Sequence, residues 1–156
     1  MDHVTAIQAI LAPALGISAV GLLLLGLNSR YSAIVNRIRL LNEERRRLIR
    51  LLAEDTNLSY TDNTRYMSIA NQTKELLLRS RLVRNAILSM QTAIALFVLS
   101  STAIGVNIFV TIPVVRALPL FVFIVGMLSV FVGVLFAGRE VHRSFKSILI
   151  DVKADE

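Results

Sequence analysis

The sequence contains no cysteine, and its two histidines, His3 and His142, stand near opposite ends of the 156-residue chain. The missing cysteine excludes a disulfide, a thiolate nucleophile and a cysteine-ligated metal. Two distant histidines offer little to a metal site or a catalytic triad, and the chain has neither a glycine-rich phosphate loop nor a nucleophile with a plausible base. We therefore expect no enzymatic activity, no cofactor and no bound metal.

Charge is also scarce, since 18% of the residues are charged and 54% are hydrophobic. A soluble domain has about 25% charged residues. Charges avoid three mainly apolar runs, at residues 4–27, 86–112 and 118–137. Each run reaches the roughly 18 residues that a membrane-spanning helix needs. The sequence thus predicts an all-α membrane protein, a single membrane unit with three transmembrane helices.

No Asp, Glu, Lys, Arg or His lies within any of the three runs. Proton relays, voltage sensors and charge-paired transport sites usually depend on such a group inside the membrane. We therefore do not expect this chain alone to form a proton-driven motor or an ion-coupled pump.

The basic residues are unevenly distributed along the chain. Of 17 Lys and Arg residues, 12 lie between Arg30 and Arg84, four follow the third run, and the connection before that run has only Arg116. The positive-inside rule explains this distribution, and the net charge of +6, better than nucleic-acid binding does. It predicts an outer amino terminus, with residues 28–85 and a tail at 138–156 in the cytoplasm.

Small residues recur along the first run, which we expect to become helical near Asp2–Thr5. Their spacings of three, four and seven place them on one face: Ala9, Ala12, Gly16, Ala19 and Gly26. Small residues allow close helix–helix packing in lipid. We expect this face to be a helix-packing face that contributes to homo-oligomer formation.

A heptad pattern of apolar residues occupies the basic stretch at residues 28–85. One seam comprises Tyr31, Ile34, Ile38, Leu41, Arg45, Leu48 and Leu52, and a second comprises Tyr66, Ile69, Thr73, Leu76, Ser80, Val83, Ile87 and Met90. Turn-forming residues at 55–60 separate the seams, and Thr61 or Asp62 can cap the second helix. The pattern predicts a long cytosolic antiparallel coiled-coil hairpin that is continuous with the first two spans.

Arg45 is the one charged residue on the first seam. Antiparallel pairing through a turn near Ser59 would place it opposite residue 73 or 74, within reach of Glu75. Because an unpaired buried arginine is costly, Arg45 must pair with Glu75, reach solvent or face a gap between subunits.

Pro113 and Pro119 bracket the connection before the third run, which predicts a tight outer turn with Pro119 near the first turn of the span. Ser129 and Gly133 form one pair of small residues within this span. Gly138 is expected to loosen the end of the helix. A short amphipathic segment at 139–156 would then lie on the inner membrane surface.

Polar residues in the second run form two stripes. Ser89, Ser100 and Asn107 share one face, and Gln91 and Thr102 share roughly the opposite one. One stripe could line a water-filled path while the other bonds across helices. The alternative is that all of them make ordinary packing hydrogen bonds.

Arginines supply the remaining candidate contacts. Arg46, Arg47 and Arg50, together with Arg45, either bind an acidic partner or form a solvated helix face. Arg30 and Arg84, at the membrane edges, are expected to anchor lipid headgroups.

The stretches at 7–14, 21–31 and 40–46 resemble a family of small bacterial membrane proteins, catalogued as a domain of unknown function. The resemblance covers most of the chain and implies a three-span protein of the bacterial inner membrane. It carries no functional residue over. In topology alone the chain also resembles ring-forming subunits of the TolQ/ExbB type.

Two hypotheses follow. The first is a homo-oligomer whose second spans surround an ion or small-solute path, which makes the protein a channel. The second is a non-conducting scaffold, whose cytosolic hairpin docks a protein partner. Membrane lipid contacts the spans in both.

Overall fold

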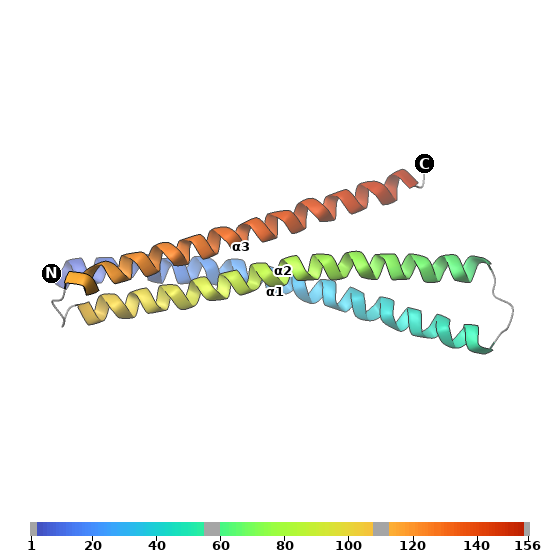
Figure 1. Ribbon diagram of the computed structural model, residues 1–156, viewed down its shortest axis with the longest axis horizontal. Coiled ribbons are helices and arrows are strands. Elements are labelled where there is room, and N and C mark those ends of the chain that lie inside the picture. The colour runs from blue at the N-terminus through green and yellow to red at the C-terminus, as the bar shows by residue number, and fades with distance from the viewer. Residues whose placement is uncertain (1–2, 55–59, 108–112, 155–156) are drawn as a thin grey trace.

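The computed structural model is made of three long helices (Figure 1), α1 at His3–Glu54, α2 at Tyr60–Asn107 and α3 at Pro113–Ala154. The structure describes the backbone of residues 3–54, 60–107 and 113–154, and the side chains of residues 8, 10–50, 64–107 and 117–144. All three helices are long and apolar enough to cross a membrane. The chain is therefore an all-α, multi-pass membrane protein with three transmembrane helices, as predicted.

The second helix, α2, is the centre of the arrangement. Both α1 and α3 pack against α2, whereas in the described residues α1 and α3 barely touch. Figure 1 shows α1 and α2 running antiparallel over their whole length, and α3 diverging from them toward its carboxyl end. The molecule is thus an elongated row of three helices with α2 in the middle.

The predicted heptad seams form the buried faces of α1 and α2. Ile34 and Leu41 of α1, and Ile69, Val83 and Met90 of α2, are buried. The same 3-4 spacing extends into the apolar run of α1, where further seam positions are buried or half-buried: Ile17, Val20, Leu24 and Leu27. One continuous seam therefore joins the two helices. The supercoil of a coiled coil stays a prediction.

Phe97 of α2 fills the core of the apolar part, where it packs against both α1 and α3. Its buried ring lies between two glycines: a methyl group on Gly16 would come within 3.0 Å of the ring, and one on Gly126 within 2.7 Å. On the α3 side the ring also lies 5.3 Å, centroid to centroid, from Phe123. Larger residues at Gly16 or Gly126 would hold α1 or α3 away from α2, so these two glycines set the spacing of the helices here.

Two expectations about α3 are wrong. The helix begins at Pro113 and includes Pro119, so residues 113–119 are helical and do not form a tight turn. Proline is compatible with the first helical position, where no backbone N–H bond is needed. The helix also continues through Gly138 to Ala154, so residues 139–154 extend the same helix and do not form a separate segment.

The ends of the other helices differ less from prediction. As expected, α1 continues without interruption past its apolar run, to Glu54. The second helix begins at Tyr60, just before the predicted caps Thr61 and Asp62. Tyr60, the last residue of the break predicted at 55–60, is therefore helical. The rest of that break (55–59), residues 1–2 and the 108–112 link lie outside the described residues.

Candidate functional site

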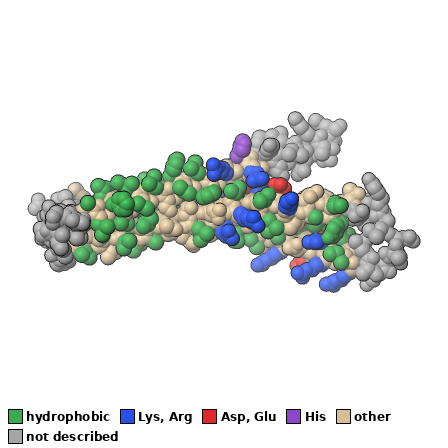
Figure 2. All heavy atoms as spheres, viewed as in Figure 1, with side chains coloured by type: hydrophobic (Ala, Val, Ile, Leu, Met, Phe, Trp, Pro, Cys, Tyr) green, Lys and Arg blue, Asp and Glu red, His purple; other side chains and the backbone are tan. Residues whose placement is uncertain are grey.

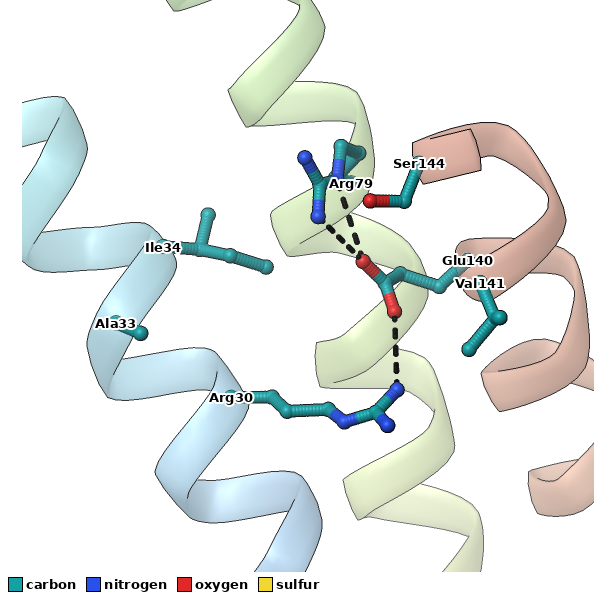
Figure 3. A pocket seen from close by; sticks show the side chains of 7 residues that line it. All are labelled: Arg30, Ala33, Ile34, Arg79, Glu140, Val141 and Ser144. Atoms are coloured by element: carbon teal, nitrogen blue, oxygen red, sulfur yellow. Dashed lines mark hydrogen bonds and ion pairs between the residues drawn. The ribbon is translucent and has the colours of Figure 1, made fainter. Parts of the chain in front are cut away.

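The most unusual group of side chains is an ion-pair cluster that joins all three helices (Figure 3). Glu140 of α3 is almost fully buried, with 5% of its side chain exposed. Arg79 of α2 donates two hydrogen bonds to Glu140 Oε1, from Nε at 3.2 Å and from Nη2 at 3.0 Å. Arg30 of α1 forms an ion pair with the other carboxylate oxygen, Nη1 to Oε2 at 3.6 Å. We call Arg30, Arg79 and Glu140 the junction cluster.

The junction cluster lies where the uncharged part of the molecule meets its charged part (Figure 2). Arg30 comes three residues after the first apolar run, and Glu140 comes three residues after the third. Because α2 runs antiparallel to α1 and α3, Arg79, which precedes the second run, lies at the same end. The alternating directions of the helices therefore bring the three residues to one level.

An open cavity of about 420 Å³ adjoins the cluster. Its wall consists of the junction cluster together with Ala33, Ile34, Val141 and Ser144. Two guanidinium groups face one carboxylate here, so the cavity carries an excess of one positive charge. Arginine presents donors in a fork that matches carboxylates and phosphates. The arrangement is chemically suited to an anion.

The sequence contained a signal for this site that the periodicity did not reveal. Glu140 is the only Asp or Glu between residues 76 and 150, a stretch that contains seven Lys and Arg residues. A single acid among so many bases indicates a specific partner. Arg30 was expected to anchor a lipid headgroup, which stays a prediction, and in the structure it also forms an ion pair with Glu140. Arg79 was not singled out from the sequence.

The stripe predicted to line a pore lies largely against α3. Ser100 is buried and donates a hydrogen bond to the carbonyl of Pro119 at 2.8 Å. Ser89 donates to the Asn85 carbonyl, and its own carbonyl accepts a 2.8 Å hydrogen bond from Ser129 of α3. Asn107 is half-buried. Ser89 and Ser100 therefore take part in α2–α3 packing within one chain.

The opposite stripe of α2 faces outward. Gln91 and Thr102 are both exposed. The Thr102 hydroxyl donates to the Val98 carbonyl within its own helix. The two stripes therefore differ: the serine stripe packs inside the chain, whereas Gln91 and Thr102 lie on its outer surface.

The small residues of α1 do not all face the same neighbour. Gly16 packs on Phe97, so within the chain it serves α1–α2 packing. Ala12, Ala19 and Gly26 are exposed, and the side chain of Ala9 lies outside those described. Contact of the exposed members with a second copy stays a prediction.

Arg45 is exposed and contacts Tyr66, so of the three alternatives the approach to Glu75 is wrong and access to solvent is confirmed. Its Nη2 donates to the Tyr66 hydroxyl at 2.9 Å, and the guanidinium carbon lies 5.3 Å from the centre of the ring. The residue opposite Arg45 is therefore Tyr66 and not residue 73 or 74, because the helix pairing is centred before Ser59. A neighbouring ion pair joins Glu44 to Arg65 at 2.6 Å.

The other predicted arginines point to solvent. Arg46, Arg47, Arg50 and Arg84 are exposed and, among the side chains that the structure describes, make no ion pair. Figure 2 shows Lys and Arg side chains gathered over one part of the molecule. This surface is strongly basic.

Comparison with protein families gives one result. Residues 10–150, which make up most of the chain, match the model of a family described as "Protein of unknown function (DUF2721)". The chain belongs to this family. No curated protein and no solved structure matches the DUF2721 chain. The family assignment agrees with the resemblance found in the sequence.

Proposed function

We propose that this DUF2721 protein is a non-enzymatic membrane interaction protein, which docks an acidic partner on the basic extension of α1. One observation carries the proposal. Between residues 37 and 50, α1 has six arginines and two glutamates, and one of these glutamates, Glu44, is paired with Arg65 of α2. Most of the positive charge is therefore uncompensated and exposed.

The second span supports a non-conducting role. The hydroxyls of Ser89 and Ser100 bond to backbone carbonyls of the same chain. Phe97 and Met90 fill the interior beside them. These two serines therefore use their hydroxyls for packing within one chain, which supports a role that needs no conducting path.

Photo-crosslinking in cells tests the docking proposal. A crosslinker placed at Arg39 of the full-length protein should capture a discrete acidic partner. Capture should fall at least tenfold in a triple variant of Arg46→Gln, Arg47→Gln and Arg50→Gln. A matched variant, Arg84→Gln with Arg139→Gln, removes exposed charge elsewhere and should leave capture unchanged. Equal capture by both variants would contradict the proposal.

A second candidate function is an oligomeric path for ions or small solutes. The observation that favours it is the outward stripe of Gln91 and Thr102, because a polar amide facing lipid is unfavourable. In an oligomer this stripe, and not the serine stripe, would face the shared axis. Bilayer recording of purified protein, with Gln91→Leu as the variant, tests it. Absence of conductance at every voltage and tension would count against this candidate.

The orientation belongs to the same proposal. We place the protein in the bacterial inner membrane, with its amino terminus outside and both the α1–α2 link and the carboxyl end in the cytoplasm. Cysteines introduced at positions 57 and 116 should react from opposite sides. Reaction of position 57 with an impermeant reagent added outside intact cells would reverse the orientation.

A further inference from the structure

Arg30 is the member of the junction cluster that the protein holds least tightly. Its guanidinium lies 3.6 Å from Glu140, and 58% of its side chain is exposed. Arg79, by contrast, is 25% exposed and makes two hydrogen bonds to the same carboxylate. Arg79 therefore neutralises most of Glu140, and Arg30 keeps donors that can bind another anion.

The position of the cavity restricts which anion can reach it. Arg30 and Glu140 each lie three residues beyond an apolar run, or about 4.5 Å along a helix axis. The headgroup layer on each side of a bilayer is roughly 5–7 Å thick. The cavity therefore opens at the depth where phospholipid phosphates lie.

The cavity wall is amphipathic. Ala33, Ile34 and Val141 supply apolar surface directly beside the guanidinium groups and the Ser144 hydroxyl. A free phosphate ion would gain nothing from the apolar part of this wall. The glycerol and first acyl carbons of a lipid would cover it.

From these observations we propose that the junction cavity binds the phosphate of an anionic phospholipid headgroup. Arg30 contacts the phosphate directly, and Ser144 adds a hydroxyl donor. Arg79 acts indirectly, because its two hydrogen bonds neutralise most of the charge of Glu140 and leave Arg30 able to bind the phosphate. Glu140 limits the affinity, since its negative charge competes with the phosphate for Arg30. The binding site is independent of the partner surface on the α1 extension.

Native mass spectrometry of the full-length protein tests the site. The protein is released from mixed micelles that contain equal amounts of phosphatidylglycerol and phosphatidylcholine, and the retained lipids are counted. The wild type should retain phosphatidylglycerol in preference. Arg30→Gln should reduce that retention about tenfold, the scale expected for one charged hydrogen bond. The matched control Arg39→Gln removes another exposed arginine of α1, outside the cavity, and should behave as the wild type.

Glu140→Gln makes the test two-sided. Removing the carboxylate charge raises the excess positive charge at the cavity from one to two, so retention of phosphatidylglycerol should increase several-fold. Circular dichroism establishes that each variant keeps its helix content. A folded Glu140→Gln protein that retains less phosphatidylglycerol than the wild type would overturn the role given to the carboxylate.

A last comparison distinguishes the two sources of phosphate. Inorganic phosphate at millimolar concentration should neither displace phosphatidylglycerol nor raise the melting temperature in phosphatidylcholine micelles. Stabilisation by inorganic phosphate that depends on Arg30 would show a free-phosphate site and overturn the lipid assignment. Equal retention by Arg30→Gln and Arg39→Gln would overturn the site altogether.

Discussion

The apolar part of the molecule and its charged part use the same seam in different ways. In the apolar part, where α3 joins α1 and α2, Phe97 closes against Gly16 and Gly126. In the charged part, formed by α1 and α2, the seam alternates between buried positions such as Leu41 and Ile69 and polar contacts such as Arg45–Tyr66. The same heptad pattern therefore gives closely packed helices in the apolar part and less closely packed helices in the charged part.

The difference follows from the two solvents. Lipid offers no hydrophobic driving force between helices, so association there depends on close packing and on hydrogen bonds between helices. Water supplies that driving force, and a few buried side chains suffice to pair two helices. We conclude that the apolar part depends on close packing, which Gly16 and Gly126 allow around Phe97, and the charged part on the burial of large apolar side chains such as Leu41.

The largest effect is expected where close packing is greatest. Phe97→Ala removes a fully buried ring and should lower the free energy of unfolding by about 3–5 kcal/mol. The exposed neighbour Leu99 provides the control, since Leu99→Ala loses only lipid contacts and should change little. Unfolding in mixed micelles titrated with dodecyl sulfate measures both. Similar losses of unfolding free energy in the two variants would contradict a close-packed core around Phe97.

Two adjacent leucines, Leu41 and Leu40, test how much buried side chains stabilise the charged part. Leu41 is buried and Leu40 is exposed, so Leu41→Ala should cost about 2 kcal/mol and Leu40→Ala almost nothing. Hydrogen exchange should show the loss between residues 30 and 84, with protection unchanged around Phe97. Uniform loss along all three helices would instead show that the two parts unfold as one unit.

Ser100 tests the contribution of hydrogen bonds in the apolar part. Ser100→Ala leaves the Pro119 carbonyl without this donor and should cost about 0.6–1.7 kcal/mol in the same micelle titration. Thr102→Ala removes a hydroxyl that bonds only within its own helix, and we expect no measurable change. If the threonine variant loses as much, the bond between helices has no special role.

The smallest effect is expected from the surface ion pair of the charged part. Glu44→Gln breaks the contact with Arg65, and because both side chains are substantially exposed the cost should be about 0.2–1 kcal/mol. The effect should disappear at about 1 M salt, where charges are screened within roughly 3 Å. Glu75→Gln, an exposed acid on α2, serves as the control. A cost that persists in high salt would point to a packing role for Glu44.

Periodicity predicted which residues of α1 and α2 are buried, because burial of a helix face requires only the correct spacing. Ile34, Leu41, Val83 and Met90 were identified in this way. The register between the helices was not predicted correctly, since the residues of the link do not by themselves fix the centre of pairing. Arg45 consequently meets Tyr66 and not Glu75.

The junction cluster was missed for a different reason. Its three members lie 49 and 61 residues apart along the chain, and they meet only because the helices alternate in direction. The end of α3 was also predicted wrongly, since a glycine after an apolar run is typical of a helix end. A single glycine destabilises a helix interior by only about 1 kcal/mol relative to alanine, and α3 continues through Gly138.

The limited contact between α1 and α3 has a consequence for how the protein is made. Each helix packs on the one that precedes it in the chain, so a helix that leaves the ribosome finds its partner already synthesised. The first two helices can pair before the third exists, and the burial of Glu140 between Arg79 and Arg30 would then mark the last step of assembly.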